Sequence, residues 1–167
     1  VHLTFEGSGA EPPLQDMALI DVVAVNDPYV GSFELFDPAT LELAVLTRAD
    51  PMSIGFAGVG GRVHPVSPSD DAGLLLRFGP AEGCTTVVRA PTAPGHFDHL
   101  GLVEVRSLSL GEEVCVEGPV LLAFDGERKR RLGDATWAAL TVCRDGPRVV
   151  DVTAVMKVAV AKDAYMR

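Results

Sequence analysis

The sequence lacks three features that each define a class of protein: a long apolar run, an excess of positive charge and a cysteine framework. No apolar run reaches the roughly 18 residues needed to cross a bilayer, so we expect no membrane partner. The formal net charge is -9, and an acidic surface repels phosphate backbones, which argues against nucleic acid as a general partner. A small anionic ligand in a local basic pocket stays compatible with this charge.

The three cysteines, Cys84, Cys115 and Cys143, fit neither a disulfide framework nor a zinc site, because their number is odd and their spacing wide. Each lies in a strand-like apolar run, so we predict buried thiols in a reducing cytoplasm. No signal peptide is visible, and the chain begins with Val1 rather than Met, from which we expect a piece of a longer protein. Its 167 residues suit one domain with its own core.

Short apolar runs separated by Gly, Pro or Asp predict a mainly β protein, an antiparallel β-sandwich with a few short helices. Residues 1–16 are polar and contain Gly and Pro, so they are predicted to be a lead-in segment before a single domain over residues 17–167. Residues 18–25 are predicted to form a buried strand. Beyond residue 62 the predicted strands are 73–78, 85–90, 101–108, 112–118, 120–124, 127–132, 136–143 and 147–152.

Three segments carry helix signals. At 37–47, Asp37 and the proline after it fit a helix start, and an apolar face follows. An Asp-Pro pair at 50–51 likewise predicts a second helix over 50–58, and the glycines that follow are predicted to end it near residue 58. Residues 151–166 are predicted to form a closing helix. An Asp-Gly pair at 145–146 predicts a hairpin turn.

A second Asp-Gly pair, at 125–126, predicts a hairpin whose return strand is basic. Side chains alternate along a strand, so Arg128 and Arg130 share one face, and Lys129 and Arg131 share the other. These cations either form a solvated edge strand, whose charge prevents edge-to-edge pairing, or face a ligand cleft or an interface.

Two polar residues, Asn26 and Asp27, follow the predicted strand at 18–25. Their donors and acceptors could bind an adenine edge or a ribose diol, but plain turn chemistry needs no ligand and is favoured by the local sequence alone. Glycines between 55 and 61 would admit either a ligand or a tightly packed backbone. The pair His96 and His99 lacks a helix and a third ligand, so we predict no metal site. No serine lies in a GxSxG context for nucleophilic catalysis.

In order along the chain, four blocks resemble the C-terminal domain of the ATP-NAD kinase superfamily, within about residues 17–153. The nearer match is to the ATP-NAD kinase-like branch that includes acetoin-catabolism protein X, because of the stretch 33–58. The blocks are AVNDPYVG at 24–31, DPMSIGFAGVGGRVHP at 50–65, RAPTAPGHF at 89–97 and LLAFDGERKRRLGD at 121–134.

The resemblance implies that this chain is one half of a two-domain architecture. In this superfamily an N-terminal α/β domain carries a GGDGT motif that handles ATP, and a C-terminal β-sandwich supplies much of the dinucleotide site and the oligomer contacts. The chain contains no GGDG. We therefore expect ATP and Mg²⁺ to act in the longer parent, no cofactor in this chain, and a homo-oligomer.

The resemblance also implies candidate ligand-binding residues. Two departures from the family pattern, Gly55 for a tyrosine and Gly95 for a histidine, put NAD specificity in doubt. The residues that match are Asn26, Asp27, Ser53, Gly60, Gly61, Asp125, Gly126 and Glu127.

We expect the turns at 26–27 and 125–126 to meet at the lip of a single hollow. The leading hypothesis is a nucleotide- or dinucleotide-binding and oligomerisation domain, inactive alone, whose parent transfers phosphoryl from ATP to a hydroxyl. The alternatives are a module that senses a nucleotide or metabolite without catalysis, and a purely structural dimerisation domain. A relationship to lipid kinases rests on residues 125–127 alone.

Overall fold

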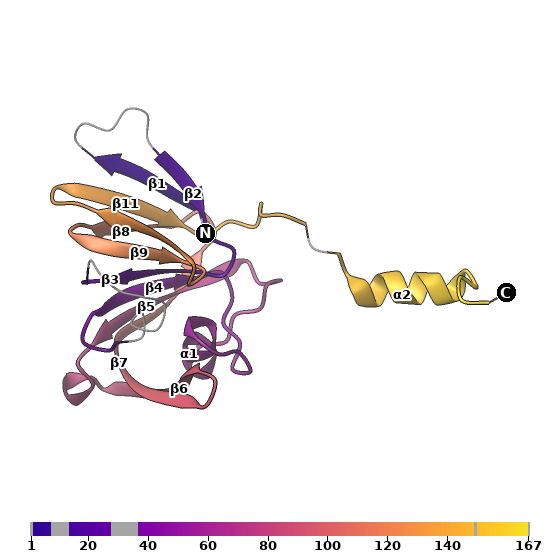
Figure 1. The fold of residues 1–167 in the computed structure, drawn as a ribbon, viewed down its shortest axis with the longest axis horizontal. Helices are drawn as coiled ribbons and strands as arrows, with labels where there is room; N and C mark the ends of the chain where they lie inside the picture. Colours follow the sequence, from indigo (N-terminus) through magenta and orange to yellow (C-terminus); the bar gives the residue numbers. More distant parts are fainter. Residues whose placement is uncertain (1, 8–13, 28–36, 149, 167) are drawn as a thin grey trace.

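Two antiparallel sheets form the body of the molecule, shown as a computed structural model in Figure 1. The structure describes residues 2–7, 14–27, 37–148 and 150–166. Within these residues the larger sheet has the strand order β10 (Arg128–Leu132), β9 (Val120–Phe124), β3 (Asp21–Val25), β4 (Leu41–Leu46), β5 (Ala72–Gly79), β7 (His96–Ser109), β6 (Thr86–Ala93). The smaller sheet has the order β2 (Leu14–Met17), β1 (His2–Gly7), β11 (Thr136–Thr141), β8 (Glu113–Glu117). The prediction of a mainly β, antiparallel protein is confirmed.

The central strands of the larger sheet, β3, β4, β5 and β9, are buried on both faces, which explains their continuous apolar runs. Along β3, Val22 and Ala24 pack into one core, and Val23 and Val25 pack into the other, as the strand period of two requires. The first core is shared with the smaller sheet, through residues such as Val116. The second lies on the side of α1 (Phe56–Val63).

The helix predicted at 50–58 is displaced: residues 50–55 form a turn, and α1 begins at Phe56 and runs through the glycines that were predicted to stop it near residue 58. A Cβ on Gly61 would lie 2.2 Å from the carbonyl carbon of Asp50, and one on Gly60 would lie 2.6 Å from a methyl carbon of Leu46. The glycines therefore let the helix pack against the chain itself and the core, which offsets their poor helix propensity. A short 3₁₀ turn, Ala81–Gly83, follows β5.

The helix predicted at 37–47 is wrong, because this segment is a turn followed by strand β4. The Asp37 carboxylate accepts a hydrogen bond of 2.9 Å from the backbone N–H of Ala39, and the backbone N–H of Thr40 donates to the Asp37 carbonyl at 3.1 Å. An Asp-Pro turn has the same local chemistry as a helix N-cap, so the sequence signal was shared by both structures.

The ends of the chain also differ from expectation. Residues predicted as a lead-in form β1 and β2, and β1 pairs with β11 along its whole length. The segment predicted as a strand at 147–152 contains no strand in its described residues. The Asp-Gly pair at 145–146 forms no hairpin, because the chain has already left the sheet after β11. The predicted closing helix is confirmed as α2 (Val152–Ala161).

The predicted burial of the cysteines is wrong as well. Cys115 is exposed because it points outward from β8, while Cys84 and Cys143 are partly exposed; all three are free. None of the helices in the described ranges is long and apolar enough to cross a membrane. Residues 28–31 of the first resembling block, and 33–36 of the stretch at 33–58, lie outside the described residues.

Candidate functional site

The two turns expected to share one hollow lie at opposite ends of a strand pair. Strands β3 and β9 run antiparallel, with Val22 opposite Phe124 and Val25 opposite Leu121. Asn26 therefore follows the end of β3 beside the start of β9, whereas Asp125 lies beside the start of β3. Their separation is on the order of five strand residues, or about 17 Å. The expectation of a single hollow is wrong, and each turn has its own surroundings.

At the first end, a hollow of about 220 Å³ combines an amide, a carboxylate and a guanidinium. We call it the Asn26 hollow; its lining residues are Asn26, Asp27, Pro119, Val120 and Arg131. The backbone N–H of Asn26 donates to the carbonyl of Thr40 at 2.7 Å, which fixes the turn. Arg131 reaches this place because it pairs with Leu121 of β9, which in turn pairs with Val25.

The chemistry of the Asn26 hollow suits a ligand with hydroxyls and an anionic group. An amide donates and accepts, a carboxylate accepts from a diol, and a guanidinium donates in a planar fork to phosphate or carboxylate. Arg131 was not among the predicted site residues. The signal that could have found it is strand alternation, which sets Lys129 and Arg131 apart from Arg128 and Arg130, together with the pairing of β10 to β9.

At the second end, the Asp125 carboxylate accepts hydrogen bonds from the protein's own backbone. It accepts them from the N–H groups of Leu19 at 2.9 Å and Ile20 at 2.7 Å, and a longer one from Asp21 at 3.3 Å. Asp125 and Gly126 both have positive φ, 52° and 74°, as the predicted hairpin turn requires. Asp125 therefore fastens the chain between β2 and β3 onto the hairpin.

The same end contains a carboxyl with an unusual affinity for protons. Burial, reinforced by the nearby charge of Asp125, raises the pKa of Asp21 from 3.8 to about 7. Asp21 is thus partly protonated at neutral pH.

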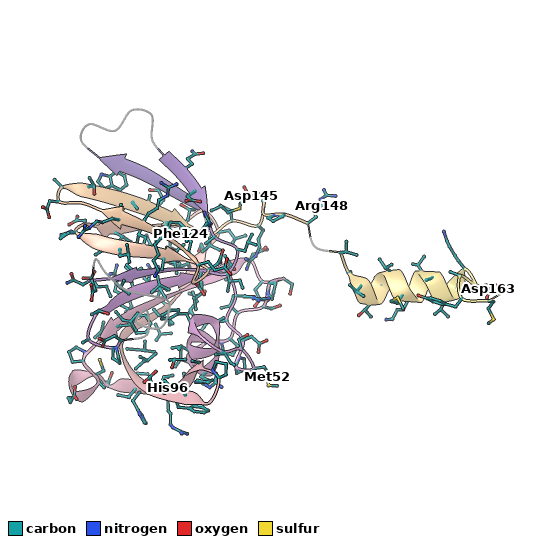
Figure 2. The ribbon with its side chains drawn as sticks, in the orientation of Figure 1. Met52, His96, Phe124, Asp145, Arg148 and Asp163 are labelled. Atoms are coloured by element: carbon teal, nitrogen blue, oxygen red, sulfur yellow. The ribbon has the colours of Figure 1, made fainter. Side chains whose placement is uncertain are left out.

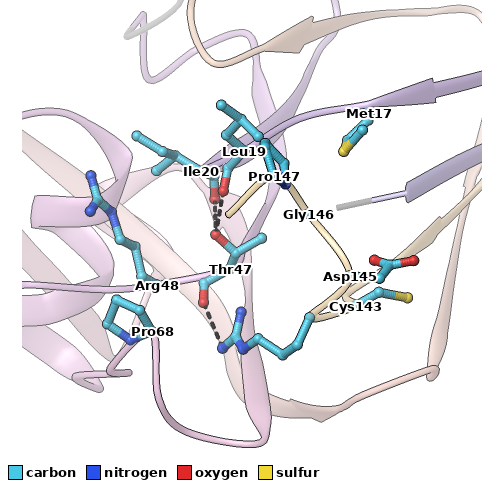
Figure 3. Close-up of a pocket in the computed structure, with 11 residues that line it drawn as sticks. Met17, Leu19, Ile20, Thr47, Arg48, Pro68, Cys143, Asp145, Gly146 and Pro147 are labelled. Carbon is cyan, nitrogen blue, oxygen red and sulfur yellow. Dashed lines mark hydrogen bonds between the residues drawn. The ribbon is translucent and has the colours of Figure 1, made fainter. Parts of the chain in front are cut away.

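Beside this end lies a larger hollow of about 410 Å³, which we call the Leu19 hollow. Figure 3 shows Leu19, Ile20 and Pro147 between Arg48 on one side and Asp145 on the other. The Thr47 hydroxyl donates to the Leu19 carbonyl at 2.8 Å. The Arg144 guanidinium donates to the carbonyls of Thr47, Asp70 and Ala72, so it holds the wall of the hollow.

The remaining arginines of the basic strand connect the two sheets. Arg128 and Arg130, on one face of edge strand β10 as predicted, both donate to the Asp16 carboxylate of β2, Arg130 at 2.9 Å. Burial acts to raise the pKa of Asp16, but these hydrogen bonds outweigh it and hold the pKa at about 2. Arg128 also lies 5.2 Å over the Phe124 ring. Arg128 and Arg130 therefore have a structural role.

The other predicted site residues do not join either hollow. Gly60 and Gly61 lie in α1 against the core and the backbone of Asp50, and Ser53 lies in the turn before it, its N–H donating to the Asp50 carbonyl at 3.0 Å. Glu127 is exposed after the hairpin turn. Neither hollow is lined by Ser53, Gly60, Gly61, Asp125, Gly126 or Glu127.

Fold and hollows together define a mainly antiparallel β domain with a small recess, lined by an amide, a carboxylate and a guanidinium, at one end of strands in its larger sheet. Residues 3–145 match the family described as the acetoin catabolism protein X C-terminal domain, and the chain belongs to this family. It is 29% identical over 145 residues to acetoin catabolism protein X of Cupriavidus necator, an alignment that covers 86% of this chain and 40% of that protein. The chain therefore spans less than half the length of this relative. No solved structure gave a significant match.

Proposed function

We propose that the chain is the ligand-binding C-terminal domain of an acetoin catabolism protein X-type protein, and that its ligand is a nucleotide or dinucleotide. The observation that carries this proposal is the convergence of Asn26, Asp27 and Arg131 on one hollow. In this view the two sheets form the sandwich typical of the ATP-NAD kinase superfamily. The amide and the carboxylate hold a ribose diol, and the guanidinium holds a phosphate.

The parent reaction in this proposal is phosphoryl transfer from ATP to a hydroxyl, with Mg²⁺, in a longer cytoplasmic protein that also has an N-terminal α/β domain. Among the described residues there is no group of three or more His, Cys, Asp or Glu that could hold a metal ion. Because the sequence contains no GGDG motif, we assign no step of the transfer to this chain. Incubated with NAD, ATP and Mg²⁺, it should form no NADP; formation of NADP would contradict this assignment.

Titration calorimetry with NAD, NADP, ATP and small diols tests the binding proposal. We expect Asn26→Ala and Arg131→Gln each to weaken nucleotide binding about tenfold or more, since each removes a hydrogen-bonding group from the hollow. Arg148→Gln is the matched control, because it removes an exposed arginine outside the lining residues. Binding that both hollow variants leave unchanged would place the ligand elsewhere.

A second candidate function is a module that senses a small metabolite without catalysis. The size of the Asn26 hollow favours it, because sites for drug-sized ligands have volumes of about 300–1,000 Å³ and this one has 220 Å³. The two departures from the superfamily pattern, Gly55 and Gly95, point the same way. A calorimetric signal with a small diol or hydroxy acid, lost in Asn26→Ala, with none from NAD or ATP would select this candidate.

A further inference from the structure

Helix α2 is apolar on nearly every side and is exposed along its length. Figure 2 shows its side chains pointing outward around the helix, away from the sheets. Thr153 and Lys157 are the polar residues within it. Val152 is 67% exposed, Val160 64% and Met156 48%. An all-round apolar helix is normally covered by protein, so this surface requires a partner.

The length of α2 leads to the same conclusion. It has 10 residues, and isolated helices shorter than about 12–15 residues are marginal in water. Its N-terminus is capped by the Asp151 carboxylate, which accepts from the N–H of Ala154 at 2.9 Å, but one cap does not hold so short a helix. Packing of its apolar surface has to supply the rest.

We propose that α2 docks into the Leu19 hollow of a second copy of this chain, in a reciprocal exchange of arms. The arm is residues 150–166. The hollow is the complementary surface on the body. Its apolar lining residues include Met17, Leu19, Ile20, Pro68 and Pro147, beside the polar Thr47, Arg48, Arg144 and Asp145, and Leu19 is 58% exposed. Its volume of about 410 Å³ gives room for side chains of one helix face, such as Val152, Val155 and Met156.

Charge supports this occupant. The arm carries two lysines and two aspartates, so it is neutral, and the excess negative charge of the protein lies on the rest of the chain. An apolar, neutral arm therefore approaches a second acidic body without the repulsion that acts between two bodies. Arg48 at one side of the hollow suits the helix C-terminus and Asp163 just beyond it.

The path of the chain favours a second copy over the arm's own body. Residues Asp145, Gly146 and Pro147 themselves line the hollow, so the arm starts there and would have to reverse within a few residues to fill it. In Figure 1, α2 lies apart from the sheets. A two-fold axis makes the exchange reciprocal and closed. The arm lies beyond the residues that match the family, 3–145.

Sedimentation velocity of the full chain tests the proposal. We expect a concentration-dependent dimer that Val155→Glu, on the arm, and Leu19→Glu, in the hollow, each weaken about tenfold or more. Val103→Glu is the matched control: it adds the same charge at a residue of β7 that is 63% exposed, and the dimer should persist. Both Leu19 and Val155 are exposed, so the variants should fold, which circular dichroism checks.

Mixing the two variants separates a second copy from the arm's own body. The Leu19→Glu chain has an intact arm and the Val155→Glu chain an intact hollow, so together they can form one good contact and should give a heterodimer. A monomer at every concentration for the unmodified chain, a dimer that survives both substitutions, or variants that stay monomeric when mixed would each overturn the proposal.

Discussion

The turns at the two ends of the β3–β9 pair have similar sequences but different surroundings. At both ends a buried strand runs into a turn with an aspartate, Asp27 at one end and Asp125 at the other. Asp125 is occupied by three backbone N–H groups, because the chain passes from β2 to β3 beside it. Asn26 and Asp27 instead line a hollow that also contains Arg131. The neighbouring segment, rather than the turn motif, gives Asp125 its structural role.

The substitution with the largest expected effect on stability at either end is Asp125→Ala. We expect it to lower the free energy of unfolding by about 2–4 kcal/mol, because it removes the acceptor for Leu19, Ile20 and Asp21 and places alanine at a φ of 52°. Urea denaturation measures the loss. Ligand affinity of the folded protein at the Asn26 hollow should not change.

Asp125→Asn is the control for this prediction. Asparagine tolerates positive φ and keeps one oxygen acceptor, so the loss should be about half as large or less. Equal losses in the two variants, or a loss below about 0.5 kcal/mol in Asp125→Ala, would show that the carboxylate does not fasten the β2–β3 connection.

A second difference between the ends is that Asp21, at the Asp125 end, makes the free energy of unfolding depend on pH. Because its pKa in the folded protein is raised from 3.8 to about 7, the fold favours the protonated form. Its stabilising contribution is complete below pH 3.8 and is lost as the pH rises through 7. Asp21→Asn should therefore raise the free energy of unfolding at pH 8 by about 1–3 kcal/mol, within the limit of about 1.4 kcal/mol per pKa unit. Thermal melting at pH 5 and pH 8 measures it, and an equal gain at both would contradict it.

The strands could be predicted because their signals are local. Apolar runs bounded by Gly, Pro and Asp located β5 and β9, and Asp125–Gly126 located a hairpin. The helix predicted at 37–47 failed because an Asp-Pro turn and a helix cap are alike, and because a strand buried on both faces loses the alternation that would identify it. The glycines of α1 are explained only by contacts with Asp50 and Leu46.

The site was harder to predict than the fold, because it depends on which strand ends meet. Asn26 and Asp27 were predicted as candidates from the residues, and Arg131 lines the same hollow only through the order β10–β9–β3. The sequence made Asp125 a candidate ligand-binding residue as well. Its three backbone hydrogen-bond partners are more than 100 positions away along the chain. Contacts of that sequence separation leave no local signal.

Asp16 tests the link between the sheets near the Asp125 end. Asp16→Asn should lower the free energy of unfolding by about 1 kcal/mol at pH 7, because it weakens charge-assisted hydrogen bonds from Arg128 and Arg130 that are partly exposed. The Asp16 pKa is lowered to about 2, so this contribution is present above pH 3.8 and is lost as the pH falls through 2. Chemical denaturation at pH 7 checks it, with Asp134→Asn, an exposed aspartate, as the control. A loss equal to that of the control would contradict the link.

The smallest expected change in stability is at the Asn26 end. Asn26→Ala should alter the free energy of unfolding by less than about 0.5 kcal/mol, because the side chain is exposed and the turn is fixed by the backbone bond to Thr40. Urea denaturation measures this beside Asp125→Ala. A loss above about 1.5 kcal/mol would mean that Asn26 is as structural as Asp125, and the contrast between the two ends would disappear. A small loss leaves the side chain available for a ligand, since a polar group that does not stabilise the fold is available to bind something else.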